Sequence, residues 1–120
     1  MRRVLIVTAL LAVRGAKARA AGDPAHGQEI YESRCIACHS ADANRVGPMH
    51  RGVFGRKAGS LPDYAYSKAL KAADIVWNDE TLDRWLTNPQ AFLPGQKMNF
   101  KIANPQDRAD VIAYLKTLTP

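Results

Sequence analysis

The spacing of apolar side chains along the chain predicts helices. In the last fifteen residues, Val111, Ile112, Leu115 and Leu118 recur at the three- and four-residue intervals that place side chains on one helix face. No segment alternates apolar and polar residues over the run of about four to eight positions that a half-buried strand requires. The pattern therefore indicates an all-α domain.

Capping residues indicate where the helices begin. Asp23-Pro24 and Asn104-Pro105 each combine an N-cap residue with a proline at the first helical position, where a missing N–H does no harm. Loops rich in Gly and Pro separate the helical segments. We expect three main helices and one short helix, over about residues 24–38, 79–87, 106–118 and 67–73.

The first twenty residues have the layout of a secretory signal peptide. The basic start Met1-Arg2-Arg3 precedes an apolar stretch of ten residues at 4–13, and Ala18-Arg19-Ala20 offers small residues at a cleavage site. The apolar stretch is shorter than the roughly 20 residues that cross a bilayer. We expect removal of residues 1–20 by cleavage at about Ala20 or Ala21, export to a bacterial periplasm, and no membrane span.

Charge gives little support to nucleic-acid binding. The chain has 17 Lys and Arg against 11 Asp and Glu, a net charge of +6. Five of the basic residues lie in the predicted leader, so residues 21–120 carry a net charge of only +1. With 47% hydrophobic residues, the remaining segment has the size and composition of one small globular domain, the predicted domain 21–120.

The candidate chemistry lies in Cys35-Ile36-Ala37-Cys38-His39. A thioredoxin-like dithiol would need a strand before the motif, and residues 24–34 instead have a helical pattern. A zinc site would need a fourth ligand from His26, His50 or an acid, without the usual second pair of ligands. Covalent haem attachment uses both thiols for the vinyl groups and places the adjacent imidazole against the iron. The motif favours haem over the other two chemistries.

A haem iron also takes a sixth ligand or keeps an open position. The candidates are Met49, Met98, His26 and His50. Met49 and His50 follow His39 too closely to reach the opposite face easily, and His26 is expected at the surface. Met98 follows His39 by 59 residues in a Pro- and Gly-containing loop with apolar neighbours. It is the favoured ligand, and the alternative is a methionine that fills the core.

From about residue 22 to 118, the sequence resembles class I c-type cytochromes of the monohaem, mitochondrial-like bacterial group. The motifs that carry this resemblance occur in the family's order: Gly27…Tyr31, Cys35-Ile36-Ala37-Cys38-His39, Val46-Gly47-Pro48, Gly52-Val53-Phe54-Gly55-Arg56-Lys57, Asp63-Tyr64-Ala65-Tyr66-Ser67, Trp77, Leu82…Trp85-Leu86, Asn88-Pro89, Pro94-Gly95…Lys97-Met98 and Arg108-Ala109-Asp110…Ala113-Tyr114-Leu115. The resemblance implies a cytochrome c fold whose helices and loops wrap around one haem.

The resemblance also implies roles for individual residues. Cys35 and Cys38 would form the thioether bonds of haem c, and His39 and Met98 would be the axial ligands. The carbonyl of Pro48 would accept the proton on the other ring nitrogen of His39. The remaining residues implied to contact the haem are Arg56, Tyr66 and Trp77 at a propionate, helped by Gly59 and Ser67, and Leu82, Trp85, Leu86 and Phe100 along the ring. Gly27, Tyr31 and Tyr114 would form a helix crossing.

Four positions depart from the family's usual residues. Trp85 stands where many relatives have a tyrosine that hydrogen-bonds the methionine sulfur. Gln96 replaces a threonine that contacts the inner propionate, and Leu70 replaces a polar residue of an interior water network. His50 replaces an apolar leucine near the proximal haem face, and we favour a surface histidine over one that titrates near neutral pH as part of the site.

These features predict a soluble one-electron carrier and not an enzyme. Histidine with methionine fills both axial positions, which leaves no site for a substrate. The implied partners are redox proteins that dock transiently at the haem edge: an oxidase, a photosynthetic reaction centre, a quinol–cytochrome c reductase or a periplasmic dehydrogenase. We expect a monomer. The alternative is a haem enzyme or gas sensor in which Met98 binds weakly or not at all.

Overall fold

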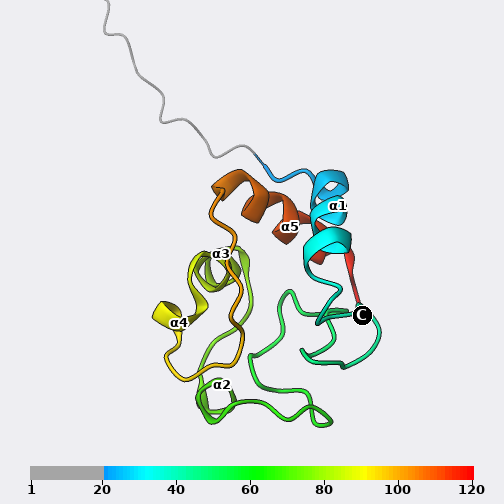
Figure 1. Cartoon of the computed structure of the whole chain (residues 1–120). Coiled ribbons are helices and arrows are strands. Elements are labelled where there is room, and N and C mark those ends of the chain that lie inside the picture. Colours follow the sequence, from blue (N-terminus) through cyan, green and yellow to red (C-terminus); the bar gives the residue numbers. More distant parts are fainter. Residues whose placement is uncertain (1–20) are drawn as a thin grey trace, which may run out of the picture.

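The computed structural model describes residues 21–120, and within them the fold is all-α, as predicted (Figure 1). Its helices are α1 (Pro24–Arg34), α2 (Lys68–Ala72), α3 (Asp79–Thr87), α4 (Pro89–Phe92) and α5 (Pro105–Thr117). The only extended pairing in this part of the chain is an isolated antiparallel bridge between Lys57 and Val76. The predicted signal peptide lies outside the described residues.

Helices α1 and α5 cross at close range, and Figure 1 shows them side by side above the remaining elements. A Cβ atom on Gly27 would lie 1.9 Å from the carbonyl oxygen of Asp110, so only glycine fits at this crossing. The rings of Tyr31 and Tyr114 pack beside it with centroids 5.2 Å apart. This is the crossing that the sequence predicts. Gly22 makes a similar approach to Ala109, which the sequence analysis missed.

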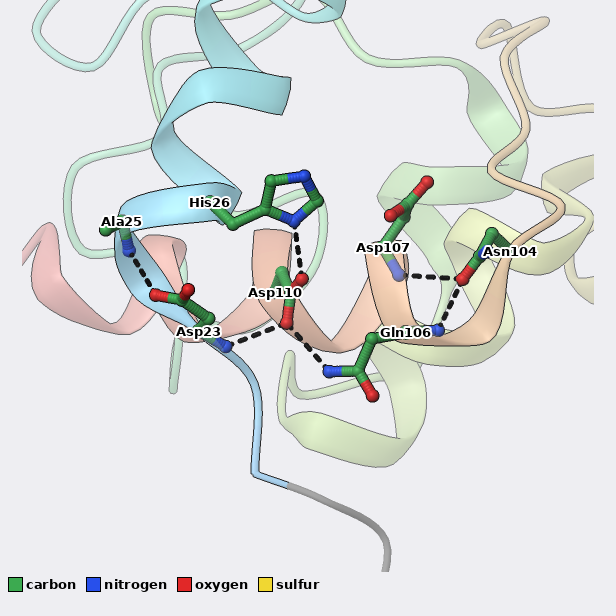
Figure 2. A network of polar contacts seen from close by, with 7 residues as sticks. All are labelled: Asp23, Ala25, His26, Asn104, Gln106, Asp107 and Asp110. Atoms are coloured by element: carbon green, nitrogen blue, oxygen red, sulfur yellow. Dashed lines mark hydrogen bonds and ion pairs between the residues drawn. The ribbon is translucent and has the colours of Figure 1, made fainter.

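Hydrogen bonds of Asp110 also join the two helices (Figure 2). Its Oδ1 atom accepts hydrogen bonds from the backbone N–H of Asp23, at 2.8 Å, and from Nε2 of Gln106, at 2.9 Å. Its Oδ2 atom lies 2.6 Å from Nδ1 of His26. The imidazole of His26 and the carboxylates of Asp107 and Asp110 lie close enough together to resemble a metal-ligand cluster. However, both oxygens of Asp110 are already engaged in hydrogen bonds, so the cluster serves to join α1 to α5.

The helix boundaries follow the capping residues, with three differences from the expected elements. The predicted first helix ends at Arg34, because the chain tightens into a turn over residues 35–38. Helix α4 was not predicted. It uses the same Asn-Pro start as α5: Asn88 ends α3, and its side chain then accepts from Ala91 N–H at the start of α4. Ser67 is the N-cap of α2 and not its first residue.

Below the α1–α5 pair, the loops between residue 39 and α2 face the segment from α3 to the start of α5, and α2 lies beneath α3 and α4 (Figure 1). The buried guanidinium of Arg108 stabilises the segment from α3 to the start of α5, because it pairs with Asp83 at 2.8 Å and donates to the carbonyl of Ile102 at 2.8 Å. These contacts hold the loop that carries Met98 against α3 and α5. Within residues 21–120, no helix has the length and hydropathy of a membrane span.

Candidate functional site

A largely apolar cavity of about 570 Å³ lies between the loops that follow residue 39 and the segment from α3 to the start of α5. Its volume is in the range of roughly 300–1,000 Å³ that ligand pockets occupy. All twelve residues that sequence and resemblance assign to the site line this cavity: Cys35, Cys38, His39, Pro48, Arg56, Tyr66, Trp77, Leu82, Trp85, Leu86, Met98 and Phe100. Residues from α3 and from the three loops that precede α2, α3 and α5 therefore meet around a single space.

The cysteine motif forms one tight turn at the cavity wall. Backbone N–H groups of Cys38 and His39 both donate to the carbonyl of Cys35, at 3.2 and 2.9 Å. The turn follows α1 directly, because the N–H of Cys35 donates to the carbonyl of Tyr31. Two thiols and an imidazole are thus presented to the cavity by five consecutive residues.

The two alternative chemistries, a redox dithiol and a zinc site, fit this geometry poorly. Burial raises the pKa of the Cys35 thiol to about 11, whereas a reactive redox dithiol depends on a lowered thiol pKa. Within residues 21–120, the ligand atoms of Cys35, Cys38 and His39 do not gather into a compact group of the kind that holds a metal ion. The motif instead spreads its groups along the wall of a space much larger than a zinc ion.

The imidazole of His39 is fixed in one tautomer. Nδ1 lies 2.8 Å from the carbonyl oxygen of Pro48, and because a carbonyl only accepts, Nδ1 carries the proton. Nε2 then has a free lone pair that can bind a metal. A Cβ atom on Gly47 would lie 2.1 Å from Cε1 of His39, so the backbone of Gly47 also packs against the ring.

His50 is not the surface histidine that the sequence analysis expects. Its ring stacks on that of His39, with centroids 4.0 Å apart and planes 20° apart. Its Nδ1 is hydrogen-bonded to the hydroxyl of Tyr31 at 2.9 Å. Burial, with contributions from His39 and Arg56, lowers the pKa of His50 well below its usual value. His50 is buried because the loop after Pro48 turns inward and places this side chain on the cavity wall.

The four candidate sixth ligands separate clearly in space. Met98 lines the cavity, whereas Met49 and His26 do not. His26 lies in the first turn of α1, where its ring contacts Asp110 of α5 (Figure 2). His50 lines the cavity, but it lies flat against His39 and therefore on the same side of the cavity. Met98 is the remaining candidate that can approach from a different wall.

Gln96 supports the loop that carries Met98. Its Oε1 atom accepts a hydrogen bond from the backbone N–H of Met98, and its Nε2 atom donates to Gln90 at 3.0 Å. Gln96 is buried but does not line the cavity. A glutamine at this position therefore stabilises the loop internally, unlike the threonine of relatives that is implied to reach a propionate.

The cavity wall also contains a cation that has no acidic partner among residues 21–120. Arg56 donates to the carbonyls of Met49, at 2.9 Å, and Arg51, at 3.3 Å, and forms no ion pair with any acid in residues 21–120. Burial lowers its pKa. The hydroxyl of Tyr66 accepts from Leu61 N–H and keeps its own proton available for donation. A buried anion such as a haem propionate would neutralise the positive charge of Arg56 in the cavity wall.

Backbone pairing brings Arg56 and Trp77 together. The N–H of Trp77 donates to the carbonyl of Arg56 at 2.9 Å, next to the bridge between Lys57 and Val76. Ser67 uses its hydroxyl oxygen to cap α2, and Gly59 provides a turn with φ of +69°. Both residues line the cavity beside this pair.

One face of α3 forms the apolar wall. Leu82, Trp85 and Leu86 recur at helical spacing, and the rings of Trp85 and Trp77 meet edge to face with centroids 5.3 Å apart. Phe100 closes the cavity beside Arg34, whose guanidinium lies 5.2 Å from the ring centroid. The sequence-based list of site residues lacks Tyr31, Gly47, His50, Tyr64, Leu70, Val111 and Leu115, which also line the cavity. The helical periodicity of residues 111 and 115 indicated only a core face.

Comparisons with known proteins agree with this geometry. Residues 24–119 match the sequence profile of the family described as cytochrome c. The chain is 49% identical over 100 residues to cytochrome c of Euglena viridis, covering 81% of this chain and 98% of that protein. It is 45% identical over 119 residues to cytochrome c2 of Rhodomicrobium vannielii, covering 96% and 94%. The solved structure of cytochrome cH from Methylobacterium extorquens matches with a TM-score of 0.76 at 44% identity, covering 80% of this chain and 99% of that one.

Proposed function

This chain belongs to the cytochrome c family, and we propose that it uses a haem c attached through Cys35 and Cys38 and ligated by His39 and Met98. Members of this family carry covalently bound haem c. They are electron-transfer proteins and not enzymes. One observation carries the proposal. The two thiols and the tautomer-fixed imidazole lie on one turn at the wall of the cavity that Met98 also lines. The bound haem would supply a one-electron couple between its ferrous and ferric states.

The cysteine motif and Pro48 fit the attachment of a porphyrin. The turn at residues 35–39 presents both sulfurs at one edge of the cavity, where Cys38 is exposed and Cys35 is half-buried. The carbonyl of Pro48 holds the proton on Nδ1 of His39, so that Nε2 is available to an iron atom and gains basicity from the hydrogen bond.

Met98 completes the ligand set by elimination and by its surroundings. A stacked ring such as His50 cannot approach an iron atom from the side opposite His39. A thioether ligand stabilises the reduced state and gives a higher potential than a second imidazole. The apolar wall of Leu82, Trp85 and Leu86 acts in the same direction, because burial disfavours the extra positive charge of the oxidised state.

The exposed edge of the cavity is the proposed docking site for redox partners. Cys38, Val46 and Lys97 are exposed and also line the cavity, so they mark its opening. Val46 is 74% exposed and Ile36, two residues before Cys38, is 47% exposed, which offers a small apolar contact surface near this opening. With a net charge of only +1 for residues 21–120, docking would be weak and transient.

The proposed setting is the bacterial periplasm, reached through the leader at residues 1–20. There the protein would act as a monomer. It would exchange electrons with a membrane complex, such as an oxidase, a reaction centre or a quinol–cytochrome c reductase, or with a periplasmic dehydrogenase.

Spectra and mass of the purified mature protein test the proposal. We expect the mass of one covalent haem, a low-spin spectrum, and in the oxidised protein the near-infrared band of a sulfur-to-iron bond. A high-spin spectrum without that band would support the haem enzyme or sensor instead. A protein of haem-free mass would rule out both functions.

A further inference from the structure

A hydrogen-bonded pair of aromatic side chains lies behind the imidazole of His39. Tyr31 comes from α1 and His50 from the loop after Pro48, and the two join through the contact of 2.9 Å between the hydroxyl and Nδ1. The ring of His50 then stacks on His39. The three side chains form a continuous series from the α1–α5 crossing to the motif histidine.

The pair is held firmly at both ends. Tyr31 is only 3% exposed, and its ring packs against Tyr114 of α5 with centroids 5.2 Å apart. The backbone N–H of His50 donates to the carbonyl of Ser40 at 3.1 Å, and its carbonyl accepts from Val53 at 2.9 Å. With backbone and side chain both bonded, the ring of His50 has little freedom to turn.

His39 needs such a contact to have a fixed orientation. The hydrogen bond to Pro48 selects the tautomer, but a single contact at Nδ1 is compatible with a range of ring tilts. A flat ring at 4.0 Å restricts rotation of the imidazole out of its plane. This restraint differs from that of an aliphatic side chain, which offers no flat surface and no hydrogen bond to Tyr31.

We propose that Tyr31 and His50 are positioning residues that fix the plane of the His39 imidazole, with Tyr31 acting only through His50. The inference rests on the proposed function, because it takes His39 as an iron ligand. The orientation of an axial imidazole affects how its orbitals overlap with those of the iron. Removal of the pair should therefore change the electronic structure and the potential of the site while both axial ligands stay bound.

The test uses the full haem-loaded protein with His50→Leu, Tyr31→Phe and the double variant. The readouts are the g values of the oxidised protein, the paramagnetic shifts of the haem methyl protons, and the midpoint potential. We expect His50→Leu to shift all three and Tyr31→Phe to shift them less. The double variant should match His50→Leu, because the hydroxyl has no route to His39 once His50 is gone.

His26→Gln is the matched control. It removes another side-chain contact of a histidine in this half of the protein, but His26 does not line the cavity, so the three readouts should stay at wild-type values. If His50→Leu fails to fold, His50→Phe keeps a ring of similar size without the hydrogen bond, and we expect it to resemble Tyr31→Phe.

The inference is overturned if g values and methyl shifts stay unchanged in His50→Leu, or in both ring-preserving variants where His50→Leu does not fold. It is also overturned if the effects of Tyr31→Phe and His50→Leu simply add. Failure of the proposed function gives a different result, since the wild-type protein itself would then lack covalent haem or the near-infrared band.

Discussion

Nδ1 of His26 and Oδ2 of Asp110 lie 2.6 Å apart and join the start of α1 to the middle of α5 (Figure 2). Burial opposes ionisation of Asp110, but hydrogen bonds from the backbone N–H of Asp23, from His26 and from Gln106 hold its pKa below the usual value. The same contact raises the pKa of His26 above 6.5. The pair therefore links protonation to the packing of the two helices.

This linkage predicts how stability depends on pH. Because the folded state raises the pKa of His26, its contribution is fully present below the unfolded value of about 6.5 and is lost as the pH rises through the folded value. We expect the denaturation midpoint of the wild type to fall over this window. His26→Gln should lack this component when both proteins are unfolded in denaturant across the same pH series. Parallel curves would contradict the assignment.

Gly27→Ala tests the helix crossing. The added methyl would lie 1.9 Å from the carbonyl oxygen of Asp110, so α1 and α5 must separate. Overpacking of this kind costs about 1–3 kcal/mol, and alanine's better helix propensity returns about 1 kcal/mol at most. We expect a lower free energy of unfolding for the haem-loaded protein in denaturant. Gln28→Ala, at the next and exposed position of α1, is the control and should change stability by less than about 0.5 kcal/mol.

Met98→Ala should remove the sixth iron ligand. We expect the near-infrared band to disappear, the potential to fall, and exogenous ligands such as imidazole or cyanide to bind, because the position left by the sulfur becomes open. Met49→Ala is the control, since Met49 does not line the cavity and its loss should leave the spectrum unchanged. An unaltered potential in Met98→Ala would exclude this residue as the ligand.

Arg56→Gln should lower the midpoint potential. The wild-type guanidinium places a positive charge at the cavity, which disfavours the more positive oxidised state. Its loss should shift the potential downward by up to about 59 mV, a tenfold change in a one-electron equilibrium. The potential should also become more dependent on pH, because a propionate without its cation takes up a proton more easily.

Arg51→Gln is the control for this charge effect. Arg51 is paired with Asp42 at the surface and does not line the cavity. Voltammetry of both variants over one pH range separates the local effect from the general loss of a positive charge. Equal shifts in the two variants would argue against a propionate at Arg56.

Tyr31→Phe should rescue the stability of His50→Leu. His50→Leu leaves the hydroxyl of a nearly buried tyrosine without its partner, which costs about 1–3 kcal/mol, whereas removal of both partners approaches neutrality. We expect the double variant to have a higher free energy of unfolding than His50→Leu alone. Denaturant titration of the haem-loaded proteins measures this difference, and a double variant less stable than His50→Leu would contradict it.

The sequence by itself determined the features that depend on short-range contacts. Asp23-Pro24 and Asn104-Pro105 set the helix starts through hydrogen bonds within three residues, and the helical face of residues 111–118 follows from the 3.6-residue period. The cysteine motif was sufficient to predict haem attachment because its two thiols and imidazole lie within five consecutive residues, which form one turn. Gly27 marked the crossing because a close helix approach demands the smallest residue.

Only the tertiary structure decided the features that depend on which distant segments meet. Histidines are found on surfaces and in interiors alike, and His50 is drawn inward because the Tyr31 hydroxyl and the His39 ring are both there to receive it. Gln96 turns to its own loop and not to the cavity for a similar reason, since Gln90 and the backbone of Met98 satisfy its amide. Such placements depend on burial and on partners many residues away, and no local pattern in the chain encodes them.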